Sequence, residues 1–157
     1  MKYSTRCSVA IHCMLVIALF GQEERLTSAL IAKSTGCNAT TIRSIFQQLQ
    51  QAELIIVRQG TGGAILGREP SKITIWDIYS AVQPQEDRSP LRIHANPYAH
   101  CPVGRRIQEI LAEPYQRIGE AMQGQMQAYT LAMLLRRYEE LGAREDQIRQ
   151  ENTTDAG

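Results

Sequence analysis

Residues 26–67 most constrain the fold, because two short helical patterns, a tight turn and a strand hairpin follow one another there. Leu30 and Ile31 give the first pattern an inward face, and Gly36 ends it. Asn38 then predicts the start of a second helix, as its N-cap. The second pattern has an amphipathic stripe made by Ile42, Ile45, Phe46 and Leu49. Two such helices joined at a glycine are typical of a helix-turn-helix.

A hairpin is expected directly after the second helix. Residues 54–57 are apolar and rich in β-branched side chains, and residues 64–66 can form a short return strand. Glycines occupy the turn between them, at Gly60, Gly62 and Gly63. A hairpin in this position is the wing of a winged helix-turn-helix, which we predict as the core of a DNA-binding domain over residues 1–83.

The segments around the helix-turn-helix also predict helices. Residues 4–20 are apolar around nearly the whole circumference of a helix, so this helix should be buried on several sides. Either Thr27 or Ser28 is expected to cap the next helix. Thr74 and Asp77 have the spacing of a capping box and predict a further helix that Pro84 stops.

The C-terminal half predicts a loop followed by long helices. The loop is expected over residues 84–102, because residues 85–102 are polar and contain three prolines, and Pro84 precedes them. From residue 103 an apolar stripe follows a near-heptad pattern, with members at positions 107, 111, 115, 118, 122, 126, 129 and 133. Pro114 predicts a short helix to about residue 112 and a longer one after it. The stripe is too long for one small domain to bury, so we predict dimerisation helices over residues 103–143 and a disordered tail over 144–157.

Composition narrows the class of protein. The chain has 157 residues and a formal net charge of +1. Residues 1–83 carry eight cations and five carboxylates, a balance of +3, so the front half suits an anionic partner better. The apolar run at residues 9–20 is too short to span a membrane. The four cysteines form no Cys-x-x-Cys pair, which argues against a zinc finger and favours a reducing cytoplasm.

The second helix of the helix-turn-helix carries the main candidates for DNA contact. Residues 38–52 contain one cation and no acid, so no carboxylate repels a phosphate backbone. Hydroxyls, amides and one guanidinium suit phosphates and base edges. The expected outward residues are Thr40, Thr41, Arg43, Ser44, Gln47 and Gln48. Taken alone, this pattern also fits a merely solvated polar face.

Further candidates lie in the wing and at helix starts. Arg58 is expected to reach a phosphate or the minor groove, while the wing glycines would let the hairpin tip approach DNA; an ordinary glycine-rich turn is the alternative. Lys2, Tyr3, Ser4 and Ser28 are expected to add contacts to the DNA backbone. A frayed terminus is the alternative for the first three.

Several motifs together resemble the Rrf2 family of bacterial winged-helix regulators, over residues 1 to about 135. The wing-to-helix motif is the most specific of them. The resemblance implies a dimer with crossed long C-terminal helices, and DNA contacts at Thr40, Thr41, Arg43 and residues 58–63. The motifs are Tyr3-Ser4, Ser8-Val9-Ala10-Ile11-His12, Leu26-Thr27, Gly60-x-Gly62-Gly63-x-x-Leu66, Pro70-x-x-Ile73-Thr74-Ile75-x-Asp77-Ile78 and Cys101-Pro102-Val103-Gly104.

The cysteines depart from the cluster-binding branch of that family, whose members carry three closely spaced cysteines in the loop before the long helix. Here the loop contains only Cys101, with His94 and His100 nearby and His12 elsewhere in the chain. A cysteine-ligated iron–sulphur cluster normally needs more thiolates, so no cofactor is expected. A second hypothesis makes Cys101 a redox sensor, because a helix start close to it would favour the thiolate; a structural cysteine is the alternative.

The other cysteines and the aromatic pair are assigned structural roles. Cys7 and Cys13 lie on different helix faces and are expected in the core, and Cys37 is expected in a turn, partly exposed. Trp76 and Tyr79 are expected to pack against the wing side rather than to form a ligand cage.

Taken together, these features predict a mainly helical winged helix-turn-helix homodimer that binds double-stranded DNA and no membrane. We expect a repressor that occupies a roughly palindromic operator and responds to a redox or small-molecule signal. Two alternatives are an iron–sulphur sensing regulator that uses Cys101 with histidine or acidic ligands, and a winged helix that binds only protein. No nucleophile elbow or phosphate loop is present, so an enzyme is not expected.

Overall fold

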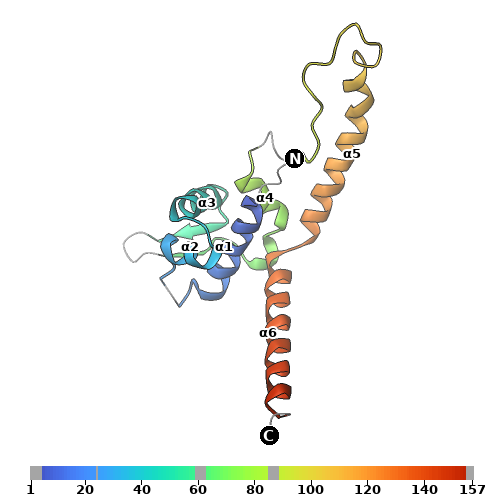
Figure 1. Cartoon of the computed structure of the whole chain (residues 1–157). Coiled ribbons are helices and arrows are strands. Elements are labelled where there is room, and N and C mark those ends of the chain that lie inside the picture. Colours follow the sequence, from blue (N-terminus) through green and yellow to red (C-terminus); the bar gives the residue numbers. More distant parts are fainter. Residues whose placement is uncertain (1–4, 24, 59–62, 85–88, 155–157) are drawn as a thin grey trace.

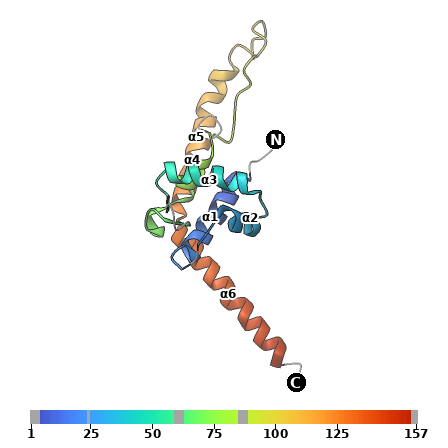
Figure 2. The ribbon, with the colours of Figure 1, turned by 90° about the vertical axis from the view of Figure 1, so that its left-hand side faces the viewer.

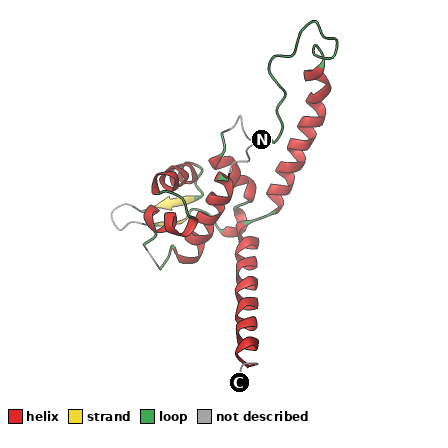
Figure 3. Cartoon of the chain, in the orientation of Figure 1, coloured by secondary structure: helices red, strands yellow, loops and turns green. Residues whose placement is uncertain are grey.

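The computed structural model describes residues 5–23, 25–58, 63–84 and 89–154. A compact helical part lies to one side, and two long helices extend away from it in different directions (Figure 1). Figure 3 shows that helices dominate, with a small two-stranded sheet. The elements are α1 (Arg6–Phe20), α2 (Ser28–Thr35), α3 (Ala39–Gln51), β1 (Ile55–Val57), β2 (Ala64–Leu66), a 3-10 turn (Pro70–Lys72), α4 (Ile75–Val82), α5 (Ile107–Ala128) and α6 (Leu131–Thr154).

Helix α1 is the centre of the compact part. It packs against α2, α4, α6 and β2, which explains why its sequence is apolar on nearly all sides. Its inner face supplies four fully buried or nearly fully buried side chains, those of Ala10, Cys13, Met14 and Ile17. Together with Ile31, Ile42, Ile45, Leu49, Leu54, Ile55, Ile73, Ile78 and Val82 they form one continuous core.

Local sequence signals set the ends of the two helices of the helix-turn-helix. Thr27 caps α2 by accepting a hydrogen bond from the Leu30 N–H at 3.2 Å. Gly36 ends α2 in the left-handed conformation, with φ of 69°, which glycine adopts without steric cost. Asn38 then caps α3 through the Thr41 N–H at 2.8 Å. The tight turn between these caps sets the angle between the axes of α2 and α3.

The wing is an antiparallel pair of three-residue strands. Ile55 pairs with Leu66, Ile56 with Ile65 and Val57 with Ala64. The pair is closed at its base, where the Gly67 N–H donates to the Leu54 carbonyl at 2.9 Å. Strand β1 therefore begins four residues after the end of α3, and the wing stays attached to that end through the Leu54 N–H, which donates to the Leu49 carbonyl at 2.9 Å.

The junction between the two long helices is fixed to the start of α4. Thr74 and Thr130 form an isolated antiparallel bridge. The Ile75 N–H donates to the Tyr129 carbonyl at 2.9 Å, and the Leu131 N–H donates to the Ile73 carbonyl at 2.8 Å. Leu131 is fully buried in the core. These contacts hold the long helices at a defined position on the winged domain (Figure 2).

The predicted helix break at Pro114 is wrong. Helix α5 runs from Ile107 through Pro114 to Ala128, and the break comes at Tyr129 and Thr130. Proline removes the helical partner of the Ile110 carbonyl, but this stretch of α5 is exposed, so water can satisfy that oxygen. The bridge to Thr74 interrupts the helix instead, and the apolar stripe is therefore divided between α5 and α6.

Two further boundaries differ from the expectations. Helix α5 begins at Ile107, four residues later than expected, after turns that occupy residues 99–106. The structure continues α6 to Thr154, where we expected a disordered tail from residue 144. Glutamate, glutamine and arginine are common in residues 144–154 and favour helix, and no proline interrupts them. Among the described residues, no helix has both the length and the apolar composition needed to cross a membrane.

The capping box of α4 provides a first test of the fold. Thr74 Oγ1 accepts from the Asp77 N–H at 3.1 Å, and the Asp77 carboxylate accepts from the Thr74 N–H at 2.8 Å. Thr74→Ala removes the cap, so we expect a loss of about 0.5–2 kcal/mol in the free energy of unfolding. Urea denaturation measures it. Thr74→Ser keeps the hydroxyl and should unfold close to the wild-type midpoint; an equal loss in both variants would contradict the capping explanation.

Candidate nucleic-acid interface

The outer face of α3 presents a row of polar side chains to solvent. Thr40, Arg43, Gln47 and Gln50 are all exposed, and their spacing of three, four and three residues places them on one side of the helix. The opposite side is buried through Ile42, Ile45 and Leu49. No acidic residue occurs on α3. The helix therefore offers amides, a hydroxyl and one guanidinium in a single row.

Two of the expected outward residues are placed differently. Ser44 and Gln48 are half-buried and face the first residue of α1 rather than open solvent. Arg6 Nη2 donates to Ser44 Oγ at 2.8 Å and to Gln48 Oε1 at 2.6 Å, and Arg6 Nε donates to Gln48 Oε1 at 3.2 Å. Thr41 is also half-buried, with its N–H used by the Asn38 cap. The row of exposed polar side chains on α3 is thus narrower than the sequence suggested.

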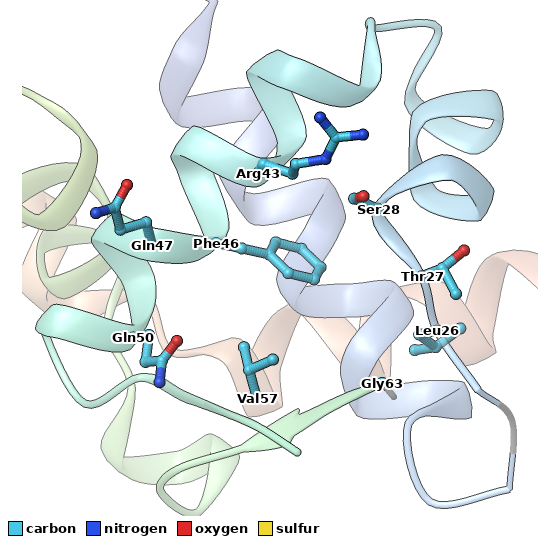
Figure 4. Close-up of a pocket in the computed structure, with 9 residues that line it drawn as sticks. All are labelled: Leu26, Thr27, Ser28, Arg43, Phe46, Gln47, Gln50, Val57 and Gly63. Carbon is cyan, nitrogen blue, oxygen red and sulfur yellow. The ribbon is translucent and has the colours of Figure 1, made fainter. Parts of the chain in front are cut away.

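A groove lies between α3, the start of α2 and the wing (Figure 4). Its volume is about 310 Å³. The Phe46 ring projects into it, and Arg43 points toward Ser28 at the start of α2. The remaining lining residues are Leu26, Thr27, Gln47, Gln50, Val57 and Gly63. The groove has an apolar floor and a polar rim that includes one cation and no carboxylate.

The wing carries one further cation, on the residue that follows the groove-lining Val57. Arg58 is exposed and directly follows β1, and its N–H donates to the Gly63 carbonyl at 3.0 Å. Gly63 has φ of 104°, a conformation that favours glycine. Gly60 and Gly62 lie outside the described residues, as do the candidate contacts Lys2, Tyr3 and Ser4.

Arg43 and Arg58 are available for an anionic partner. Among the described residues, ion pairs join Lys72 to Glu69, Arg117 to Glu113 and Arg137 to Glu140. Neither Arg43 nor Arg58 takes part in them. A guanidinium that is exposed and without a carboxylate partner can contact phosphate or a guanine edge without first breaking an ion pair.

The histidines and cysteines do not form a metal site among the described residues, where no group of three potential ligands is found. The His100 and Tyr98 rings make a tilted contact, with ring centroids 5.4 Å apart, while His12 lies on α1 and is within hydrogen-bond distance of Ser34 Oγ, 3.0 Å away. Cys101 is the only thiol in the loop. This donor set does not match a conventional cysteine-ligated cluster.

The structure also changes the argument for a reactive Cys101. Cys101 is half-buried, and its N–H donates to the Tyr98 carbonyl at 3.1 Å. Because α5 begins only at Ile107, Cys101 does not lie at a helix start, and the expectation that a helix dipole favours its thiolate is wrong. Burial, and secondarily the nearby Cys37 thiol, raises the pKa of Cys13 to about 12, so that thiol stays protonated in the core. Burial also raises the pKa of Cys7.

The two aromatic residues of α4 lie next to each other. The ring centroids of Trp76 and Tyr79 lie 5.6 Å apart, and both side chains are half-buried. Sequence reasoning missed two features of the interface. One is the set of hydrogen bonds from Arg6 to Ser44 and Gln48, which we call the Arg6 clasp, and the other is the groove around Phe46. The Arg6 clasp joins residues about forty positions apart, so no local sequence pattern predicts it.

Comparison with known sequences finds similarity to transcriptional regulators along most of the chain. A profile of the Rrf2 family, described as an iron-dependent transcriptional regulator, matches residues 3–137. The chain is 33% identical over 128 residues to the HTH-type transcriptional regulator YwnA of Bacillus subtilis, covering 82% of this chain and 92% of that protein. It is 24% identical over 151 residues to the HTH-type transcriptional regulator IscR of Photobacterium profundum, covering 94% and 84%.

Solved structures agree on the fold. A crystal structure of a DNA-binding protein superimposes with a TM-score of 0.68 at 30% identity, covering 83% of this chain and 98% of the other. T. potens IscR superimposes with a TM-score of 0.65 at 22% identity, covering 90% of each chain. The mainly helical winged-helix fold is therefore confirmed.

Proposed function

The chain belongs to the Rrf2 family of transcriptional regulators, which are not enzymes, and we propose that it represses transcription by binding a roughly palindromic operator as a homodimer. That it is a DNA-binding regulator follows from the family and its relatives. The operator symmetry, the repression, the dimer and the signal are the proposed parts. We place its action in the cytoplasm, where bacterial DNA lies.

The acid-free row on α3 is the observation that supports DNA reading most directly. Thr40, Arg43 and Gln47 project from one side of a helix whose other side is fixed in the core. Such a helix can enter the major groove, where hydroxyl, guanidinium and amide groups match base edges. Ser28, which lines the groove beside this row, and the exposed Arg58 on the wing are proposed to contact the DNA backbone.

Uncovered apolar side chains on the long helices support the homodimer. No residue of α5 is fully buried within one copy of the chain. Ile110, Ile118 and Met133 are each more than 40% exposed. Isolated exposed apolar residues are ordinary, but a stripe along a protruding helix indicates an interface. A second copy of the same helix would cover it and would bring two recognition helices to successive half-sites.

Binding to duplex DNA tests the function. The purified protein should bind random duplex with an affinity that falls steeply with added salt. Lysine and arginine side chains that contact phosphates release the counterions condensed on DNA, and added salt opposes that release. The protein should also select a recurring, two-fold-symmetric sequence from a random duplex library. A winged helix that binds only protein would do neither, and that outcome would refute the proposal.

Arg43→Ala tests the recognition helix. We expect a loss of about 1–3 kcal/mol in binding to the selected duplex, or roughly a 5- to 150-fold weaker affinity, because Arg43 is expected to read a base edge. Fluorescence anisotropy at fixed salt measures it. Arg117→Ala, which removes the same charge from an exposed position on α5 outside this groove, serves as the matched control and should leave the affinity unchanged. If Arg43→Ala weakens selected and random duplexes equally, Arg43 is a phosphate anchor and not a base reader.

A redox response at Cys101 stays a hypothesis that rests on its place in the loop and its half-buried thiol. The co-reactants would be diamide and a small-molecule thiol: the Cys101 thiol and the small thiol join in a mixed disulfide, and diamide takes up their two electrons and two protons. Titration of operator binding with diamide compares wild type with Cys101→Ser. An identical response of the two proteins would remove Cys101 from consideration and leave a small-molecule signal as the alternative.

A further inference from the structure

The first residue of α1 and the recognition helix are joined by side-chain hydrogen bonds that cross the domain. Arg6 supplies two nitrogens, and Ser44 and Gln48 supply the acceptors. The acceptors are one turn apart on α3, so one guanidinium contacts two successive turns of the same face. All three side chains are half-buried, which limits the competition of water for these bonds.

The clasp lies next to the residues that are free to contact DNA. Ser44 directly follows the exposed Arg43, and Gln48 directly follows the exposed Gln47. A rotation of α3 about its axis would move both pairs together. Burial of Ile42, Ile45 and Leu49 resists such a rotation from the core side. Arg6 resists it from the side of Ser44 and Gln48, which do not line the groove that Phe46 borders.

We propose that Arg6 is a positioning residue for sequence recognition: through Gln48 and Ser44 it fixes the rotation of α3 and so aligns Arg43 and Gln47 with base edges. This inference rests on the proposed DNA binding. Arg6 acts here on the protein's own helix and not on DNA. Its effect is therefore on discrimination between duplexes, and not on the general attraction to phosphate.

Two other roles for Arg6 make different predictions. A phosphate anchor would weaken selected and random duplexes alike, and its loss would reduce the slope of log affinity against log salt by about 0.9. A residue needed only for stability would lower the unfolding midpoint and leave the ratio of the two affinities unchanged. Positioning changes that ratio and leaves the salt slope on random duplex constant, even where the lost hydrogen bonds also lower the unfolding midpoint.

The experiment uses Arg6→Met, which keeps a long side chain without donors, and Gln48→Leu, which removes the main acceptor. The probes are the duplex that the wild type selects from a random library and a scrambled duplex of equal length and composition. For Arg6→Met we expect about 10-fold weaker binding to the selected duplex and a change below about twofold on the scrambled one. Gln48→Leu should behave likewise, and the double variant should be no worse than either, because both act through one contact.

Two controls complete the test. Arg6→Lys keeps a donor but not the planar fork, so it should restore part of the discrimination. Arg68→Met removes another arginine that binds α3, through the Ala52 carbonyl at its C-terminal end at 2.8 Å, and should leave discrimination intact. Additive effects of Arg6→Met and Gln48→Leu, or an equal loss on both duplexes, would overturn the inference. A wild type that selects no sequence would instead refute the proposed function.

Discussion

Glutamate at both Ile118 and Met122 should convert the protein into a monomer and weaken its binding to a two-fold-symmetric operator by about 100-fold or more. These residues lie one turn apart on the apolar side of α5, where Ile118 is 46% exposed and Met122 half-buried in a single copy. In a dimer they would be covered, and burying two unpaired carboxylates in each subunit is strongly unfavourable. Each half-site would then be bound separately, without the high effective concentration that linkage provides.

Sedimentation velocity measures the oligomeric state of this variant, circular dichroism checks that it is folded, and anisotropy measures operator affinity. Gln116→Glu with Gln127→Glu is the matched control. It adds the same charge to α5 at exposed positions on the opposite side of the helix, and should leave a dimer. A folded Ile118/Met122 double variant that remains dimeric with native affinity would show that this face of α5 is not the interface.

Leu131→Ala should destabilise the protein by about 2–5 kcal/mol, as is usual when a fully buried leucine is truncated and the cavity does not collapse. Leu131 is 0% exposed and begins α6, directly after the bridge between Thr74 and Thr130. Its truncation removes the apolar contact that holds the long helices on the winged domain. The backbone bonds to Ile73 and Ile75 then have less packing behind them.

Urea unfolding at a fixed protein concentration measures this loss, because dimerisation would make apparent stability depend on concentration. Leu141→Ala removes the same atoms from the same helix at a position that is 44% exposed, and should cost less than about 1 kcal/mol. Equal losses in the two leucine variants would mean that the junction does not anchor α6 to the core.

Signals that act over three or four residues predicted the ends of the short helices. Thr27 and Asn38 cap through the next turn of backbone, and Thr74 and Asp77 bond to each other's backbone N–H groups. Each interaction lies within one helical turn, so the sequence alone contains both partners. The strand pair was predictable for the same reason, since a short glycine-rich turn separates its strands.

The features that the sequence did not predict depend on contacts between residues far apart in the chain. Pro114 carries a local signal to break a helix, yet the chain breaks at Thr130, because that residue pairs with Thr74 and brings Leu131 into the core. Neither contact is visible from neighbouring residues. The candidate site shows the same division: Arg43 is exposed as expected, whereas Gln48 is held by Arg6 from another helix.

The place of Arg6 has a practical consequence for preparing the protein. Because α1 starts at Arg6 and this side chain binds α3, whatever precedes it in a recombinant chain leaves the fold beside the recognition helix. A purification tag fused there would compete with the duplex for space, and a polyhistidine tag would add charge to the titration. The far end of α6 points away from the winged domain and is the safer attachment point for a tag, a fluorophore or a sensor surface (Figure 2).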